Sequence, residues 1–179
     1  MNDRRFSLQP SSPVTPLTNL KITGSITRSS NTLAIRYALL GKLTTLMIPS
    51  PADIPVRKNN LWEETCFELF LAIKNSPGYW EFNLSPAGHW NVYRFTAYRQ
   101  GMQEEEGFIS LPISVKREPG ALRLALELQL NEIVQADQLL EVGISGVIKT
   151  KDGALTYWAL SHPGPQADFH RRDSFIIEL

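Results

Sequence analysis

The 179-residue sequence contains a single cysteine, Cys66, and only three histidines. One cysteine cannot form an internal disulfide, and such sparing use of cysteine suits a reducing compartment. Cys66 lies inside an alternating pattern that is typical of a strand, so we expect a buried and inert thiol rather than a nucleophile.

The sequence also lacks an excess of charge of either sign. Lys and Arg together number 18, as do Asp and Glu, and the formal net charge is zero. A chain without a basic excess has no electrostatic reason to bind a polyanion, so we expect no nucleic-acid partner. The charged start of the chain has no apolar run behind it, and no stretch reaches the length that crosses a bilayer. We therefore expect a cytoplasmic protein without a membrane partner, and leave its oligomeric state open.

Catalytic signatures are missing as well. The sequence has no glycine-rich phosphate loop after a strand, and no GxSxG, HExxH or CxxC motif. We therefore expect a binding protein rather than an enzyme.

What the sequence does contain is strand-like alternation, densest over residues 61–95. Leu69 and Leu71 alternate with Glu68 and Phe70, and two further alternating runs follow at 79–84 and 90–95 after turn signals. Three antiparallel strands should form, with a core face and a second face that carries Glu68, Glu81 and Asn83. The pattern leaves open whether the Tyr93 row or the Arg94 row shares that second face.

Alternation continues on both sides of this meander. We expect a hairpin over 20–39, short strands at 41–48 and 109–115, and a hairpin of 142–150 with 154–160 around Lys151-Asp152-Gly153. Five leucines spaced by two, from Leu122 to Leu130, predict a core strand, because they cannot share one helical face. Asn131 favours a short helix over 132–140. The chain should end in a strand at 174–179.

These features predict an all-β protein, an antiparallel β-sandwich of the jelly-roll kind with at most one short helix. Residues 7–19 are rich in Ser, Thr and Pro, and we interpret them as an extended lead-in rather than an element. We expect a lead-in over residues 1–19 and a single domain over 20–179.

Two clusters of aromatic and polar residues are candidates for a functional site. Trp62 precedes the central strand together with Glu63 and Glu64, and Trp158 precedes a loop that contains His162, Asp168 and His170. An aromatic ring can stack on a sugar ring, and carboxylate, amide and guanidinium groups can bind sugar hydroxyls. The alternative is that the tryptophans are core residues and that the histidines only fix loops.

The residues that carry a resemblance are Trp62-x-Glu64-x-x-x-Glu68, the run YWEFNLSPAG at 79–88, and Phe169-His170 followed by Ser174-Phe175. This series resembles the DOMON-like superfamily, in the branch similar to carbohydrate-binding module family 9. The resemblance implies a jelly-roll sandwich with a sugar site or, in other branches, a haem site. In the sugar-binding members two tryptophans hold the sugar, and the matching residues here are Trp62 and Trp158. The polar candidates that it implies are Glu64, Glu68, Asn83 and Arg94.

Three functions follow as hypotheses. The first is a non-catalytic module that binds a sugar or another small polyhydroxylated ligand and needs no cofactor. The second is a haem-binding or redox domain, with a histidine and either Met47 or Met102 as axial ligands. The third is an enzyme that uses His162, Asp168 and His170 as acid/base groups or metal ligands. We expect the histidine loop to be structural or ligand-facing rather than metal-binding.

Overall fold

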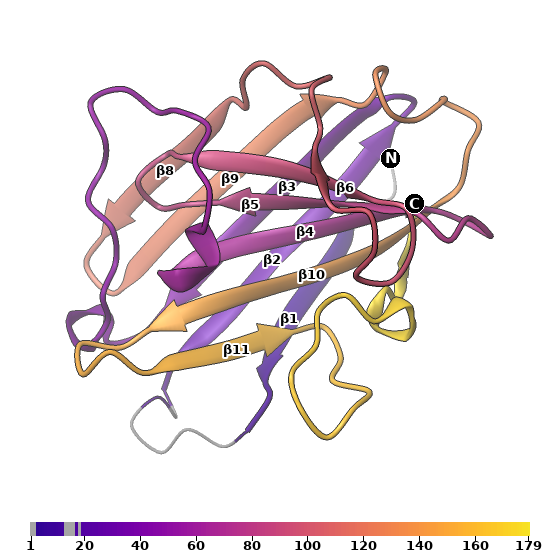
Figure 1. Ribbon diagram of the computed structural model, residues 1–179. Helices are drawn as coiled ribbons and strands as arrows, with labels where there is room; N and C mark the ends of the chain where they lie inside the picture. The colour runs from indigo at the N-terminus through magenta and orange to yellow at the C-terminus, as the bar shows by residue number, and fades with distance from the viewer. Residues whose placement is uncertain (1–2, 13–16, 18) are drawn as a thin grey trace.

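The computed structural model describes residues 3–12, 17 and 19–179. Within this part, the chain forms twelve strands in two layers, which Figure 1 shows one behind the other. The strands are β1 (Arg4–Pro10), β2 (Lys21–Ser29), β3 (Thr32–Leu40), β4 (Cys66–Ile73), β5 (Tyr79–Leu84), β6 (Trp90–Phe95), β7 (Gln103–Glu104), β8 (Ile113–Glu118), β9 (Ala121–Gln129), β10 (Leu140–Lys149), β11 (Leu155–Ala159) and β12 (Ile177–Glu178).

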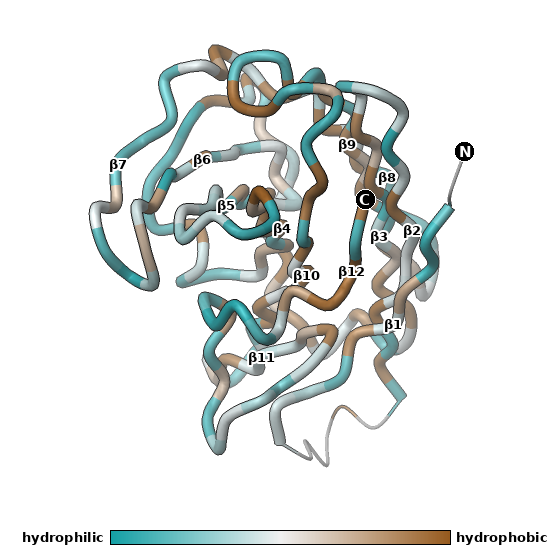
Figure 2. Tube along the Cα trace, turned by 90° about the vertical axis from the view of Figure 1, so that its right-hand side faces the viewer, coloured by the Kyte–Doolittle hydropathy of each residue, from teal (hydrophilic) through white to brown (hydrophobic). Residues whose placement is uncertain are grey.

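The first layer has the strand order β1-β2-β3-β9-β8, and the second has the order β7-β6-β5-β4-β10-β11, with β12 beside β10. Strand β1 belongs to both, because Arg4 to Leu8 pair with β2 while Gln9 and Pro10 pair with β11. The named strands pair in antiparallel fashion, and Figure 2 shows the two layers from the side. The prediction of an antiparallel β-sandwich is confirmed.

Period-two alternation builds the core between the layers. Leu122, Leu124, Leu126 and Leu128 of β9 and the following Leu130 are all buried in it, as the spacing predicts. Tyr37 of β3 crosses this core, and its hydroxyl donates a 2.8 Å hydrogen bond to the backbone carbonyl of Glu68 in β4. The two layers are therefore joined by apolar packing and by a buried hydrogen bond.

Strand β4 differs from the other strands because both of its faces are covered. Phe67, Leu69 and Leu71 face the core, while Phe70 and Ala72 pack on the opposite side in a second apolar cluster with Tyr79, Tyr93, Phe95 and Phe175. Phe175 belongs to the C-terminal segment, which lies over this side of the sheet. We call the side of β4–β6, β10 and β11 that carries Glu68 the outer face.

The helix expected over 132–140 does not form; the segment is a series of turns. The guanidinium of Arg28 donates to the carbonyl of Gln135 at 2.9 Å and to that of Gln138 at 2.5 Å, and the Gln135 carbonyl also accepts the backbone N–H of Gln138 at 3.2 Å, a contact of a turn. The helical elements in the described chain are the 3-10 turns η2 (Leu43–Thr45), η3 (Leu61–Glu63) and η4 (Arg172–Ser174). None of the described helices has the length and apolar character needed to span a membrane.

Several expected boundaries were also wrong. Residues 7–10 are not a lead-in but belong to β1, while residues 13–16 and 18 lie outside the described part. Residues 41–48 hold the η2 turn and a single bridge from Leu46 to Thr150 instead of a strand. Strand β8 begins only at Ile113, and the final strand is limited to β12 because η4 occupies residues 172–174. The central meander and both predicted hairpins are confirmed.

Candidate functional site

Strand register decides which polar side chains share the outer face. Glu68 lies opposite Asn83, and Glu81 lies opposite Tyr93, so the Tyr93 row shares the face with the two glutamates. Arg94 lies opposite Trp80 on the other face, where it is exposed and donates a 2.7 Å hydrogen bond to Gln103. The register therefore separates Arg94 from the other candidate residues.

A buried polar cluster occupies the middle of the outer face. Glu68 and Glu81 are only 3% and 5% exposed, and Asn83 is fully buried. The Ser145 hydroxyl donates to Oε2 of Glu68 at 3.0 Å, and Nδ2 of Asn83 donates to Oε1 of Glu81 at 3.0 Å. The side-chain oxygen of Asn83 has no hydrogen-bond partner among the described residues. We call Glu68, Glu81, Asn83 and Ser145 the acidic cluster.

Burial dominates the ionisation of this cluster. It raises the pKa of Glu68 well above the usual range, and the neighbouring Glu81 carboxylate raises it further. Burial also raises the pKa of Glu81 to about 7, against the opposing effects of the Asn83 hydrogen bond and the Arg99 charge. No described lysine or arginine forms an ion pair with either carboxyl group, and His170 Nε2 lies 3.7 Å from Oε2 of Glu81. Two buried carboxyl groups that repel each other therefore hold protons at a higher pH than ordinary carboxyl groups do.

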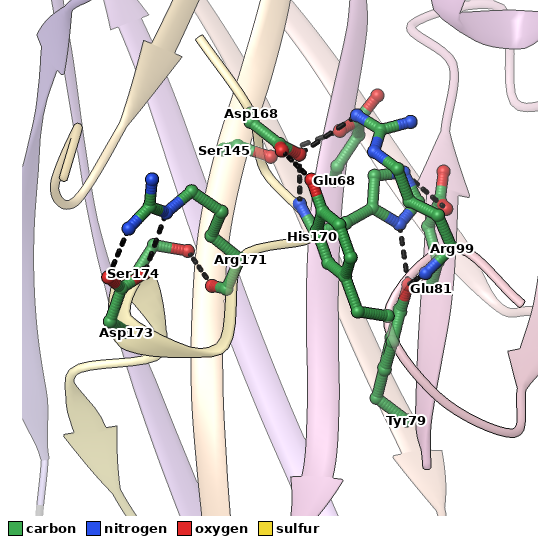
Figure 3. Close-up of polar contacts among 11 residues, drawn as sticks. Glu68, Tyr79, Glu81, Arg99, Ser145, Asp168, His170, Arg171, Asp173 and Ser174 are labelled. Carbon is green, nitrogen blue, oxygen red and sulfur yellow. Dashed lines mark hydrogen bonds and ion pairs between the residues drawn. The ribbon is translucent and has the colours of Figure 1, made fainter. Parts of the chain in front are cut away.

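His170 connects the acidic cluster to the C-terminal segment, as Figure 3 shows. The backbone N–H of Arg99 donates to the Tyr79 hydroxyl at 3.1 Å, and this hydroxyl lies 2.8 Å from Nδ1 of His170. The Tyr79 hydroxyl can therefore donate to Nδ1, which leaves the Nε2 hydrogen directed toward Glu81. Burial, with the Arg99 charge, lowers the pKa of His170 to about 4, so the ring is neutral at pH 7.

Asp168 fixes the position of the C-terminal segment above this face. Its carboxylate accepts hydrogen bonds from the guanidinium of Arg99 at 2.8 Å and from the Tyr98 hydroxyl. It also accepts the backbone N–H of His170 at 3.2 Å. Asp168 therefore stabilises the loop through the His170 backbone, and the His170 side chain remains available to Tyr79 and Glu81.

A cavity of about 290 Å³ opens beside the acidic cluster. Three of its lining side chains are aromatic: Trp62, Tyr157 and Phe169. The Tyr157 and Phe169 rings make an edge contact at 6.1 Å. Its polar and charged lining residues are Glu63, Glu68, Arg99, Asp168 and His170, and Val147, Leu155 and Ala167 complete it. Apolar walls over a small set of oriented polar groups are typical of small-ligand sites.

Trp62 is positioned by η3 and by a network of polar residues behind it. Asn60 adopts the left-handed conformation (φ 60°) at the start of η3, and the Trp62 ring packs on the edge of Tyr93 at 5.9 Å. The Tyr93 hydroxyl donates to Asn59 at 2.7 Å, and Asn91 donates to the same Asn59 oxygen at 2.8 Å. This support holds the half-buried Trp62 in place at the cavity wall.

Trp158 does not line this cavity. It is 4% exposed in the core between the layers, where its indole nitrogen donates to Thr156 at 3.0 Å. The prediction that Trp62 and Trp158 share a pocket is therefore wrong. Its neighbour Tyr157 takes that place on the outer face, because alternation turns adjacent residues of β11 to opposite sides.

Two further candidates lie outside the cavity. Glu64 is exposed and forms an ion pair with Lys149 at 2.8 Å, while the adjacent Glu63 lines the cavity instead. Nε2 of His162 lies 2.8 Å from the backbone carbonyl of Gln9, which ties the loop to β1. Of the three loop residues expected to act together, Asp168 and His170 line the cavity and His162 does not.

The structure also places the residues considered for haem ligation, metal binding and thiol chemistry. Met47 and Met102 are both almost half exposed and do not line the cavity. Within the ranges that the structure describes, no group of three or more His, Cys, Asp and Glu side chains could hold a metal ion. Cys66 is buried as predicted, and burial raises the pKa of its thiol well above the usual range.

Arg99, Tyr157 and Phe169 are cavity residues that the sequence did not suggest as ligand-binding candidates. The sequence held one signal for Tyr157, the Asp152-Gly153 turn. This turn sets the register of β10 and β11, which pairs Val147 with Tyr157 and Gly146 with Trp158. Arg99 has a left-handed backbone (φ 52°) in a turn after β6, and Phe169 lies in an irregular segment, so no periodicity marks either residue.

Comparison with known proteins yields structural neighbours only. No protein-family model matches the sequence, and no curated protein matches it. A protein of Bacteroides uniformis proposed to bind carbohydrate superposes with a TM-score of 0.70 and 12% identity, over 96% of this chain and 83% of that chain.

A family 9 carbohydrate-binding module from Caldicellulosiruptor kristjanssonii also superposes, in two complexes. The complex with cellotriose gives a TM-score of 0.53 at 11% identity, over 88% of this chain and 72% of the module. The complex with glucose gives 0.51 at 11% identity, over 87% and 72%. At such identities the likeness shows the fold, and this chain therefore has the β-sandwich fold of carbohydrate-binding modules.

Proposed function

We propose that this protein is a non-catalytic sugar-binding module, and that the cavity between Trp62 and the C-terminal segment holds one sugar ring. The observation that carries the proposal is the composition of this cavity. Aromatic side chains and a small set of oriented polar groups line the same space of about 290 Å³. That volume lies at the lower end of the range of small-molecule sites, which suits a monosaccharide or one terminal residue of a longer sugar.

The aromatic walls supply the apolar contact that such a ligand needs. A pyranose presents C–H groups on its faces, and these groups pack on aromatic rings. Trp62 is held by Tyr93 and is only half-buried, so part of its ring is free to contact a ligand. Tyr157 is 37% exposed and comes from β11, across the cavity floor formed by β4 and β10.

The polar groups would bind the hydroxyls of the sugar. Glu68 and His170 are more buried than Arg99 and Asp168, which form an ion pair with further lone-pair and N–H sites for a ligand. His170 is neutral at pH 7, so it adds no charge to the cavity. Mixed donors and acceptors suit a polyhydroxylated molecule.

Titration calorimetry against a panel of monosaccharides and disaccharides tests the proposal. A monosaccharide has few heavy atoms, so we expect a dissociation constant of roughly micromolar to millimolar. Trp62→Ala should weaken binding at least ~10-fold, and Trp62→Phe, which keeps an aromatic face, should weaken it less. If no sugar in the panel binds, or if both variants bind as the wild type does, the proposal is wrong.

We further propose a distant relationship to family 9 modules within the DOMON-like superfamily, a cytoplasmic location and no resident cofactor. The shared fold and the bound glucose and cellotriose of the neighbouring modules support the first of these. Haem binding is the alternative, and the absorption spectrum of the purified protein tests it directly, because a bound haem would give a Soret band.

A further inference from the structure

The acidic cluster has more hydrogen-bond acceptors than donors. One Glu68 oxygen accepts from Ser145 and one Glu81 oxygen accepts from Asn83. The side-chain oxygen of Asn83 has no partner in the described chain although it is fully buried. Buried acceptors without donors are uncommon in folded proteins, because each one loses its hydrogen bonds to water without compensation.

The cluster also lacks a cation. Buried carboxylates are usually paired with Arg or Lys or bind a metal, yet Glu68 and Glu81 form no ion pair with any described lysine or arginine. Arg99, whose charge acts on Glu81, is already bound to Asp168. In the free protein, protons held by the carboxyl groups take the place of a counterion, and a ligand cation could replace the proton of Glu68.

The position of Glu68 gives a ligand access to this cluster. Glu68 is the member of the acidic cluster that lines the cavity, where it lies with Trp62, Tyr157 and Phe169. Aromatic faces attract cations, and a cation held between such rings and a carboxylate is bound more strongly than a neutral group of the same size. Glu63 adds a second, exposed carboxylate at the cavity.

We infer that the sugar preferred by this cavity carries a protonated amino group, which donates to Glu68 and pairs with its carboxylate. This inference rests on the proposed sugar-binding function and names its ligand class, an amino sugar. The ammonium supplies a positive charge and N–H donors to Glu68, while the ring packs on the aromatic walls. An acetylated amine has neither the charge nor the three N–H donors, so N-acetylation should abolish the preference.

Binding of an ammonium should also displace a proton from the cluster. Burial and the Glu81 charge keep Glu68 protonated in the free protein, and a bound cation favours its carboxylate form. Affinity for an amino sugar should therefore rise with pH while the amine stays protonated, below about pH 7.5. The ionisable groups that face Glu68 or the cavity are Glu63 of η3, Tyr79 and Glu81 of β5, Arg99 of the β6–β7 loop, Tyr157 of β11, and Asp168 and His170 of the C-terminal segment.

Calorimetric titrations with D-glucosamine, D-glucose and N-acetyl-D-glucosamine test this inference. The wild type should bind glucosamine at least ~10-fold more tightly than the other two sugars, which corresponds to about 1.4 kcal/mol. In Glu68→Gln, which keeps the shape and an acceptor for Ser145, this preference should fall to less than ~3-fold. Glu64→Gln, which removes a carboxylate outside the cavity, should leave it unchanged.

The outcomes separate the inference from the function on which it rests. If glucose binds as tightly as glucosamine, or if Glu68→Gln keeps the preference, the protein is a sugar module without the ammonium site. If none of the sugars binds, both proposals are wrong. Should Glu68→Gln fail to fold, affinity of the wild type for glucosamine that does not rise between about pH 5.5 and 7 overturns the inference by itself. Thermal stabilisation by calcium chloride but not by glucosamine would identify the cluster as a metal site and contradict it.

Discussion

The Tyr79 hydroxyl of β5 lies 2.8 Å from Nδ1 of His170, which follows it by 91 positions in the chain. This contact holds the C-terminal segment against the outer face, with the His170 ring packed edge-on against Phe70 and Phe95 at 5.4 and 5.1 Å. The wall of the candidate site that comes from residues 167–170 is therefore fixed by groups of the central meander.

The ionisation of His170 should make stability fall in acid. Its pKa is about 4 in the folded protein and 6.5 ordinarily, so the unfolded chain binds the proton more tightly. The contribution is full above pH 6.5 and is lost as the pH falls toward 4. Urea unfolding of the wild type and His170→Gln should show the wild type losing on the order of 1–3 kcal/mol more than the variant over this window. Parallel pH profiles would contradict the buried neutral ring.

Glu81 should have the opposite effect in a similar range. Its pKa is about 7 in the folded protein against 4.5 ordinarily, so the folded state binds the proton more tightly. Its contribution is full below pH 4.5 and is lost as the pH rises through 7. The stability of the wild type relative to Glu81→Gln should therefore decrease by on the order of 1–3 kcal/mol from pH 4.5 to 7.5. An increase would mean that Glu81 is ionised and paired in the fold.

Leu126→Ala should destabilise the protein by about 2–5 kcal/mol, because Leu126 is 2% exposed in the core between the layers. Glu127→Ala, one residue later on the solvent side of β9, should change stability by less than about 0.5 kcal/mol. Denaturant titration of both variants checks this. Equal effects of the two substitutions would contradict the assignment of faces in β9.

Gly143→Ala should displace the C-terminal segment. A Cβ at Gly143 would lie 2.7 Å from Cδ1 of Phe175, closer than carbon atoms can approach. Gly146 of the same strand offers a control, because a Cβ there would meet its nearest neighbour at 3.5 Å, an ordinary contact. Amide hydrogen exchange of residues 167–175 should become faster in Gly143→Ala and stay unchanged in Gly146→Ala. Unchanged exchange in both variants would show that Phe175 does not hold the segment.

The sequence predicted the strands well where one face is apolar and the other polar, as in β9. It could not show which face of β4, β5 and β11 carries the site, because both faces of these strands carry large apolar or aromatic side chains. Tyr157 and Trp158 are adjacent, and only the pairing of Trp158 with Gly146 shows which ring faces the core. Tyr93 and Arg94 posed the same problem, which the pairing of Glu81 with Tyr93 resolves. The C-terminal segment has no periodicity, so its contacts had no signal in the sequence.

The central claim, a sugar held at Trp62 and not at Trp158, is tested most directly by the indole N–H signals of the four tryptophans in a ¹⁵N-labelled sample. Titration with glucose and with glucosamine should shift the Trp62 signal, because its ring lines the cavity. The Trp158 signal should stay in place, since its indole is buried and donates to Thr156. A saturable shift confined to Trp62 is the predicted result. A Trp62 signal that neither sugar moves, or a larger shift at Trp158, would contradict the account.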